Sequence, residues 1–117
     1  MNKRQVGSNK EELAAKYLEK QGYVILEKNF YCKAGEIDII ARDAEYLCFV
    51  EVKYRSDSEN GFPEEAVDPR KTGRISRSAI CYMNAAGLPE DIPCRFDVVS
   101  ILGKEFLLIK NAFDAVL

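Results

Sequence analysis

Hydrophobic and polar side chains alternate along two neighbouring stretches near the middle of the chain. In "GEIDIIARDAEYLCFVEVKYRS", residues 35–56, the alternation has a period of two on either side of residues 43–45. This period is typical of half-buried β-strands, so strands are predicted over residues 36–41 and 47–54 with a hairpin turn between them. The apolar face of this hairpin would consist of Ile37, Ile39, Cys48, Val50 and Val52.

A helical period precedes the hairpin. Ser8 followed by Glu11 has the spacing of a capping box, and Gly22 is a typical residue just after a helix C-terminus. These signals predict a helix over residues 9–21. Its apolar face would consist of Leu13, Ala14, Tyr17 and Leu18.

A second helix is predicted after residue 68. Asp68 followed by Pro69 is a typical helix start, because Asp caps the free amides and Pro suits the first helical position. The helix would end before Gly87. Its buried face would consist of Ile75, Ala79, Tyr82, Met83 and Ala86.

The remaining strands define the fold class. Residues 23–32, 94–101 and 105–110 are rich in β-branched and aromatic side chains, so each is predicted to be a strand. The element order is then α-β-β-β-α-β-β, which predicts an α/β fold of the α+β kind, with a central mixed sheet flanked by helices. A chain of 117 residues is expected to form a single domain.

Two stretches are predicted to be irregular. Residues 55–68 are polar and contain both glycine and proline, so they form either a functional loop or an ordinary surface connection. Residues 111–117 form either a short helix or a frayed end.

Charged residues occupy the polar positions of the hairpin. If the turn centres on residues 44–45, the numbers of opposed residues sum to 89, so that Asp38 faces Glu51 and Glu36 faces Lys53. Facing carboxylates repel each other, whereas a divalent cation between them reverses the sign of that interaction. A neighbouring lysine can hold or deprotonate a water, or neutralise charge on a phosphate. The alternative is a solvated sheet face with a simple Glu36–Lys53 ion pair.

The composition excludes several kinds of chemistry. The chain has no histidine, which excludes Ser-His-Asp, Cys-His and histidine-based nuclease mechanisms. Its four cysteines lack a C-x-x-C spacing, so reduced thiols are expected rather than a zinc site. The N-terminus lacks the apolar core of a signal peptide, and no apolar run reaches the roughly 20 residues of a membrane span. A cytoplasmic protein without membrane contact is therefore expected.

Basic residues gather at the start of the second predicted helix. Arg70, Lys71, Arg74 and Arg77 follow Asp68 with no further acidic residue among them. Basic side chains in a first turn oppose the helix dipole, at a cost of about 0.3–1 kcal/mol each. This placement favours contact with phosphate groups, the alternative being a solvated helix face. The net charge of −2 does not argue against such a patch, because acidic residues cluster elsewhere.

The hairpin and its surroundings resemble a known family. "GEIDII" followed by "FVEVKYRS" is similar to the D-x(n)-E-x-K signature of the PD-(D/E)XK nuclease superfamily. With "GSNKEELAAKYLEKQGY", "FPEEAVDPRKTGRI" and "RFDVVSI", the chain resembles the bacterial YraN family, which is related in pattern to archaeal Holliday-junction resolvases. The resemblance extends from Gly7 to about Phe113. It implies a restriction-endonuclease-like core, α-β-β-β-α-β, within a single nuclease-like domain spanning residues 1–117.

The resemblance also implies a role for individual residues. Asp38 and Glu51 would bind Mg²⁺ or Mn²⁺ together with the backbone carbonyl of Val52, and Lys53 would be the catalytic lysine. Glu11 would be a further acidic ligand, unless it serves the capping box. Glu36 would be secondary. Nucleic acid would be bound by Arg55, Arg70, Lys71, Arg74 and Arg77.

The expected function is that of a metal-dependent endonuclease. It would hydrolyse phosphodiester bonds of nucleic acid, with DNA as the expected substrate and branched junction DNA as a candidate. Symmetric cutting of a junction would require a homodimer. Two alternatives are a catalytically inactive nucleic-acid-binding module on the same fold, and a protein-interaction domain whose charged hairpin lies in solvent.

Overall fold

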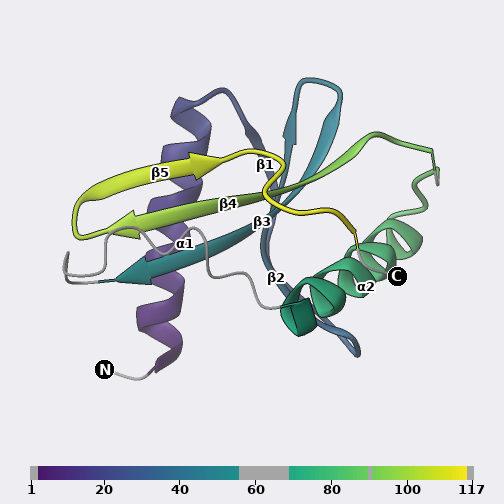
Figure 1. Ribbon diagram of the computed structural model, residues 1–117, viewed down its shortest axis with the longest axis horizontal. Coiled ribbons are helices and arrows are strands. Elements are labelled where there is room, and N and C mark those ends of the chain that lie inside the picture. Colours follow the sequence, from purple (N-terminus) through teal and green to yellow (C-terminus); the bar gives the residue numbers. More distant parts are fainter. Residues whose placement is uncertain (1–2, 56–68, 90, 116–117) are drawn as a thin grey trace.

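Five strands form one mixed sheet in the order β1-β2-β3-β4-β5 (Figure 1). The computed structural model describes residues 3–55, 69–89 and 91–115. The predicted element order is confirmed, with β3 and β4 parallel and the other neighbours antiparallel. The elements are α1 (Lys3–Lys20), β1 (Val24–Cys32), β2 (Gly35–Asp43), β3 (Tyr46–Arg55), α2 (Pro69–Ala85), β4 (Cys94–Leu102) and β5 (Glu105–Ile109).

The predicted register of the β2–β3 hairpin is confirmed over its outer part, which is the part next to the turn at residues 44–45. Five residue pairs, from Asp43 with Tyr46 to Ile39 with Val50, have numbers that sum to 89. Ala44 has φ 55°, the left-handed conformation that tight hairpin turns require. The pairing ends at Ile39 and Val50. The inner halves of the two strands, residues 35–38 of β2 and 51–55 of β3, therefore do not pair as predicted.

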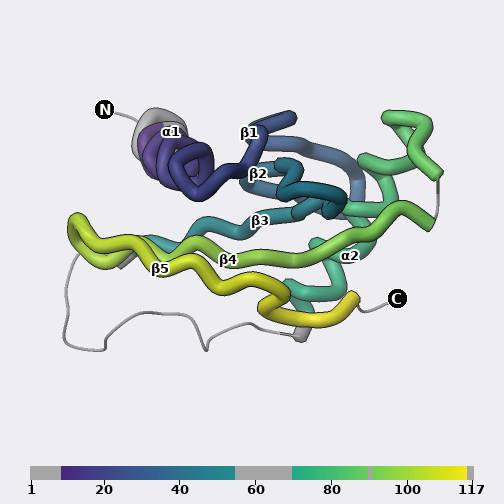
Figure 2. The backbone as a smooth tube through the Cα atoms, turned by 90° about the horizontal axis from the view of Figure 1, so that it is seen from above, coloured from purple at the N-terminus to yellow at the C-terminus, as the bar shows by residue number. Residues whose placement is uncertain are grey.

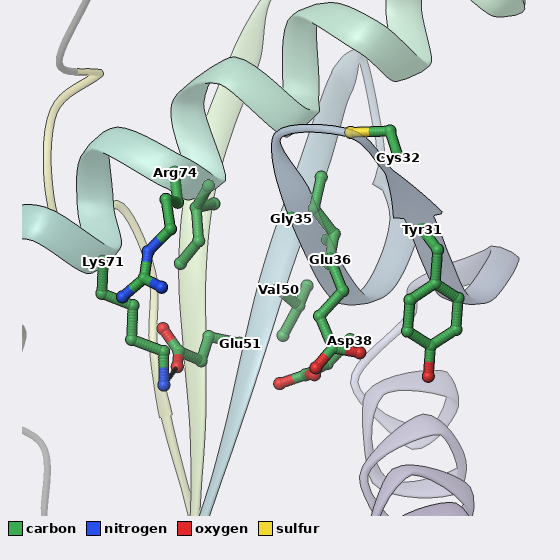
Figure 3. A pocket seen from close by; sticks show the side chains of 11 residues that line it. Tyr31, Cys32, Gly35, Glu36, Asp38, Val50, Glu51, Lys71 and Arg74 are labelled. Carbon is green, nitrogen blue, oxygen red and sulfur yellow. Dashed lines mark ion pairs between the residues drawn. The ribbon is translucent and has the colours of Figure 1, made fainter.

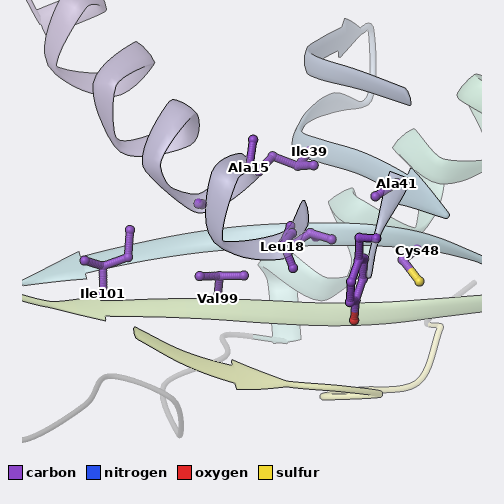
Figure 4. Packing of buried hydrophobic residues seen from close by; sticks show 10 residues of the cluster. Ala15, Leu18, Ile39, Ala41, Cys48, Val99 and Ile101 are labelled. Atoms are coloured by element: carbon purple, nitrogen blue, oxygen red, sulfur yellow. The ribbon is translucent and has the colours of Figure 1, made fainter. Parts of the chain in front are cut away.

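Helices cover both faces of the sheet, α1 on one side and α2 on the other (Figure 2). Leu18 of α1 packs over Ile39 and Val99 (Figure 4), and full burial of one such leucine contributes about 1.5–3 kcal/mol. On the opposite face, Phe49 belongs to the cluster that α2 covers through Ile75. The hairpin is therefore buried on both faces, and the expectation of a half-buried hairpin is wrong.

One residue of the hairpin lies on the other face from the one predicted. Ile37 was expected beside Ile39, but it belongs with Ile40 to the cluster under α2. The period of two is broken between residues 37 and 40, at the point where β2 leaves β3. This irregularity could not be predicted from alternation alone.

The end of α1 agrees with the prediction and its start does not. Gly22, with φ 97°, follows the helix, and the amides of Gly22 and Tyr23 bond to the carbonyls of Glu19 and Leu18, both at 3.0 Å. This is a Schellman motif. The helix begins at Lys3, so the predicted N-cap at Ser8 is wrong. The residues before it include Lys, Arg and Gln, which favour helix.

The second helix begins at Pro69 as predicted, while Asp68 lies outside the described residues. Its end repeats the first, since Gly87 has φ 67° and the Leu88 amide bonds to the Met83 carbonyl at 2.9 Å. Ala86 is exposed just beyond the helix, so its predicted burial is wrong. Leu88 packs against the cluster instead.

The C-terminal segment packs against the sheet. Phe113 stacks on Phe96 with ring centroids 5.0 Å apart, and the Ala112 amide donates to the Phe96 carbonyl at 2.7 Å. Over residues 110–115 the chain is thus neither a helix nor a frayed end. The predicted irregular stretch over residues 56–68 lies outside the described residues. No helix in the described part of the chain is long and apolar enough to span a membrane.

A charged network near the β2–β3 turn connects the end of β2 with the start of β4 and with the residues that flank β1 and β5. Asp97 is fully buried and accepts hydrogen bonds from the Tyr23 hydroxyl at 2.7 Å, Arg95 Nε at 2.9 Å and the Asn111 amide at 2.9 Å. Arg95 Nη2 also donates to Asp43 at 2.7 Å. The charge of Asp97 is therefore fully compensated, as a buried ion requires. Periodicity did not predict this network.

Gly35 offers a test of backbone strain in the β1–β2 turn. Its φ of 149° is essentially restricted to glycine, whereas a Cβ there would make only van der Waals contact, 3.4 Å from Ser78 Oγ and 3.8 Å from Arg74 Cβ. We expect Gly35→Ala to lower the free energy of unfolding by about 1–3 kcal/mol, measured by urea denaturation. Gly103→Ala is the control and should lose less stability, because its φ of 61° is the left-handed conformation that other residues adopt at lower cost and its Cβ would meet no atom within 4 Å. Equal losses for the two variants would contradict this account.

Candidate functional site

A pocket of about 440 Å³ opens between the inner halves of β2 and β3 and the start of α2 (Figure 3). Its volume lies within the range of small-molecule sites. Acidic side chains from the strands face basic side chains from the helix across it. The lining residues are Tyr31, Cys32, Gly35, Glu36, Ile37, Asp38, Val50, Glu51, Lys71, Arg74 and Ile75.

Asp38 lies where β2 and β3 separate. Its Oδ2 accepts a hydrogen bond from the Val52 amide at 2.8 Å, so a carboxylate replaces a backbone carbonyl of β2 as the acceptor. Burial first, and then the charges of Glu51 and Glu36, raise the pKa of Asp38 to about 6 against the lowering effect of the Val52 hydrogen bond. Asp38 therefore does not face Glu51 across a regular ladder as predicted, although the two carboxylates interact.

Glu51 is a buried carboxylate on β3, only 5% exposed. One of its oxygens forms an ion pair with Lys71 of α2. Its Oε2 is buried without a hydrogen-bond partner among the described residues. A solvated sheet face, the alternative interpretation of this position, is therefore excluded.

Glu11 approaches the same group of carboxylates from α1. Burial first, and then the charges of Asp38 and Glu36, raise its pKa to about 7. Its Oε2 is also buried without a partner in the described structure. Because α1 begins at Lys3, the capping-box role of Glu11 is excluded. Asp38 thus interacts with carboxylates on both sides, Glu11 from α1 and Glu51 from β3.

Lys53 is partly buried on β3, two residues beyond Glu51. Strand alternation places it on the same face as Glu51, since Val52 between them packs into the cluster under α1. It does not line the pocket. The structure therefore orients Lys53 as predicted but leaves it outside the lining, where its neighbours on β4 are those around Ser100.

The basic residues of α2 divide into two groups. Arg70, Lys71, Arg74 and Arg77 are all exposed, as predicted. Lys71 and Arg74 also line the pocket, and Figure 3 shows both side chains pointing toward Glu51. The side chain of the remaining predicted residue, Arg55, lies outside the described part.

The acidic residues can be compared with the requirements of a metal ion. Within the described ranges, no three Asp, Glu, Cys or His side chains converge closely enough to hold one. The donors nevertheless suit a hard divalent cation, because they are carboxylates and two of their buried oxygens are unpaired. The four cysteines are free thiols.

Sequence reasoning missed the contact between Lys71 and Glu51. It also missed Tyr31 and Cys32, which form one wall of the pocket at the end of β1. No local pattern marks these residues, because their proximity depends on where α2 crosses the sheet. Only the basic character of the α2 start was an available signal.

The fold and this site define a small α/β protein with an acidic pocket beside a basic helix. The chain belongs to the uncharacterised protein family UPF0102, whose family model matches residues 10–101. It is 56% identical over 115 residues to a UPF0102 protein of Lachnoclostridium phytofermentans, covering 98% of each chain. It is 46% identical over 108 residues to one of Syntrophus aciditrophicus, covering 89% of this chain and 84% of that one. UPF0102 is the YraN-like family, so the family membership expected from the sequence is confirmed.

The raised pKa of Glu11 predicts a pH-dependent stability. The folded protein binds the Glu11 proton more tightly than the unfolded chain, so stability falls as pH rises from the ordinary value of 4.5 to about 7. In the presence of a chelator, Glu11→Gln should therefore gain more stability relative to wild type at pH 8 than at pH 5. Urea denaturation at both pH values measures the difference.

The neighbouring Glu12 supplies the control. Its pKa is lowered by a hydrogen bond from Lys28, so its contribution has the opposite sign and is lost as pH falls. Glu12→Gln should show no gain at pH 8. A Glu11→Gln difference that is the same at both pH values would contradict the prediction.

Proposed function

We propose that the protein is a Mg²⁺- or Mn²⁺-dependent phosphodiesterase that cleaves nucleic acid, with DNA, including branched DNA, as the substrate. The main support is the pocket in which Glu36, Asp38 and Glu51 face the basic start of α2, with the charge of Glu11 acting on Asp38 from α1. A strongly perturbed carboxylate group in a pocket is typical of a functional site. A basic surface at its edge suits a phosphate backbone.

The sequence resemblance supports the same proposal. Asp38, Glu51 and Lys53 match the D-x(n)-E-x-K signature of the PD-(D/E)XK nucleases. The observed order α-β-β-β-α-β-β contains the order of the restriction-endonuclease-like core. The relationship to Holliday-junction resolvases is the basis for including branched DNA among the substrates.

Asp38 and Glu51 would hold the metal ion, with Glu11 and the carbonyl of Val52 as further ligands. The amide of Val52 bonds to Asp38. Because the N–H and C=O of one residue point to the same edge of an extended strand, the Val52 carbonyl is directed to the same side of β3 as this hydrogen bond. A bound Mg²⁺ would polarise a phosphate oxygen and lower the pKa of a bound water.

The remaining groups would act on water and phosphate. Lys53, on the same face of β3 as Glu51, would hold or deprotonate the attacking water, or neutralise charge on the phosphate. Lys71 and Arg74, at the pocket, would bind the phosphate next to the scissile bond. The outer residues Arg70 and Arg77, together with Arg55, would position the backbone further away.

Cleavage assays on a panel of labelled DNA test the proposal. In Mn²⁺, the wild-type protein should cut at least one of duplex, single-stranded and four-way DNA, whereas Glu51→Ala and Glu51→Gln should lose cleavage because the cation is no longer held. Glu45→Gln removes an exposed carboxylate at the hairpin tip and is the matched control. It should cleave like wild type.

Three results would contradict the proposal in different ways. If Glu51→Gln cuts as fast as wild type, the site assignment is wrong. If wild type shifts DNA in a gel but cuts nothing in Mg²⁺ or Mn²⁺, the protein is a binding module without turnover. A protein that neither cuts nor binds DNA would be an interaction domain.

A further inference from the structure

The ion pair between Lys71 and Glu51 joins two very different environments. The Glu51 side chain is 5% exposed, whereas that of Lys71 is 51% exposed (Figure 3). The buried partner depends on the pair more than the exposed one, because a buried carboxylate without a counter-ion is costly whereas an exposed ammonium remains hydrated. The ion pair therefore stabilises the charge of Glu51 more than it stabilises the charge of Lys71.

Lys71 acts on more than one carboxylate of the site. Its positive charge also stabilises the ionised form of Asp38. The two acidic residues that would hold a divalent cation are thus the two on which Lys71 acts. The Lys71 ammonium therefore supplies, at the same place, part of the positive charge that the cation would supply.

The position of Lys71 on α2 makes this contact reversible. It lies in the first turn of the helix, where a positive charge is disfavoured by the helix dipole. Its half-exposed side chain can turn into water at little cost to the ammonium once a cation compensates Glu51. Arg74 lies one turn further along the same helix and points into the same pocket. A released ammonium would therefore be available to a phosphate group at the pocket.

We propose that Lys71 is an internal counter-ion of this site and competes with a divalent cation for Glu51. The inference rests on the proposed function. Binding of the cation releases Lys71 from Glu51, and the released ammonium then contacts phosphate. Cation and nucleic acid each favour the binding of the other through this exchange.

Isothermal titration calorimetry with Mn²⁺ alone tests the competition without any activity measurement. Lys71→Met should bind Mn²⁺ about fivefold more tightly than wild type, since the competing ion pair is removed. Lys71→Arg keeps the charge and should bind like wild type. Lys104→Met removes an equal charge from the exposed β4–β5 turn and should also bind like wild type.

A double-mutant cycle in chelator provides a second measurement. Lys71→Met should lower the midpoint of urea unfolding in the wild-type background and have almost no effect in a Glu51→Gln background. If wild type binds Mn²⁺ but Lys71→Met binds it no more tightly, the inference is overturned and the proposed function stands. If wild type takes up no Mn²⁺, the inference and the proposed function are both overturned.

Discussion

The hydrogen bond from the Val52 amide to the Asp38 carboxylate determines how the centre of this protein is built. It provides a side-chain acceptor where a regular hairpin would use a backbone carbonyl, so β2 can separate from β3 while Val52 keeps its partner. The separation creates the space beneath α2 and brings Ile37 to the face that α2 covers. The geometry of the pocket therefore follows from a carboxylate that takes a main-chain role, which also explains why a charged residue occupies this position of a buried sheet.

The buried charges at the two ends of the sheet differ in how fully they are paired with hydrogen-bond donors. At the outer end, Asp97 is surrounded by donors from Tyr23, Arg95 and Asn111, and its charge is compensated within the fold. At the inner end, Glu11 and Glu51 each keep a buried oxygen without a partner among the described residues. A fold that needed these charges only for stability would compensate them as it compensates Asp97. The contrast supports the inner end as the functional one.

The helix α2 connects this acidic group with the protein surface. Its apolar side, including Ile75 and Ala79, holds it against the sheet, and this packing sets where its first turn lies. Gly35, with φ 149°, forms part of the β1–β2 turn that lines the pocket beside the helix. The basic first turn is then placed at the pocket mouth, where Lys71 reaches Glu51. Packing of apolar residues thus determines which charges meet.

The sequence by itself determined the elements, their order, the mixed sheet and the hairpin register next to the turn, because alternation, helical period and turn residues are local properties. It also singled out Asp38 and Glu51 by their residue types and spacing, whereas Glu11 was singled out through the family resemblance. Only the tertiary structure decided that the hairpin is buried on both faces, that Asp38 bonds to Val52, and that Lys71 pairs with Glu51. Such contacts depend on where the two helices cross the sheet, and no local sequence pattern encodes that position. The start of α1 at Lys3 and the exposure of Ala86 show the same limit, because the end of a helix depends on its surroundings as well as its own residues.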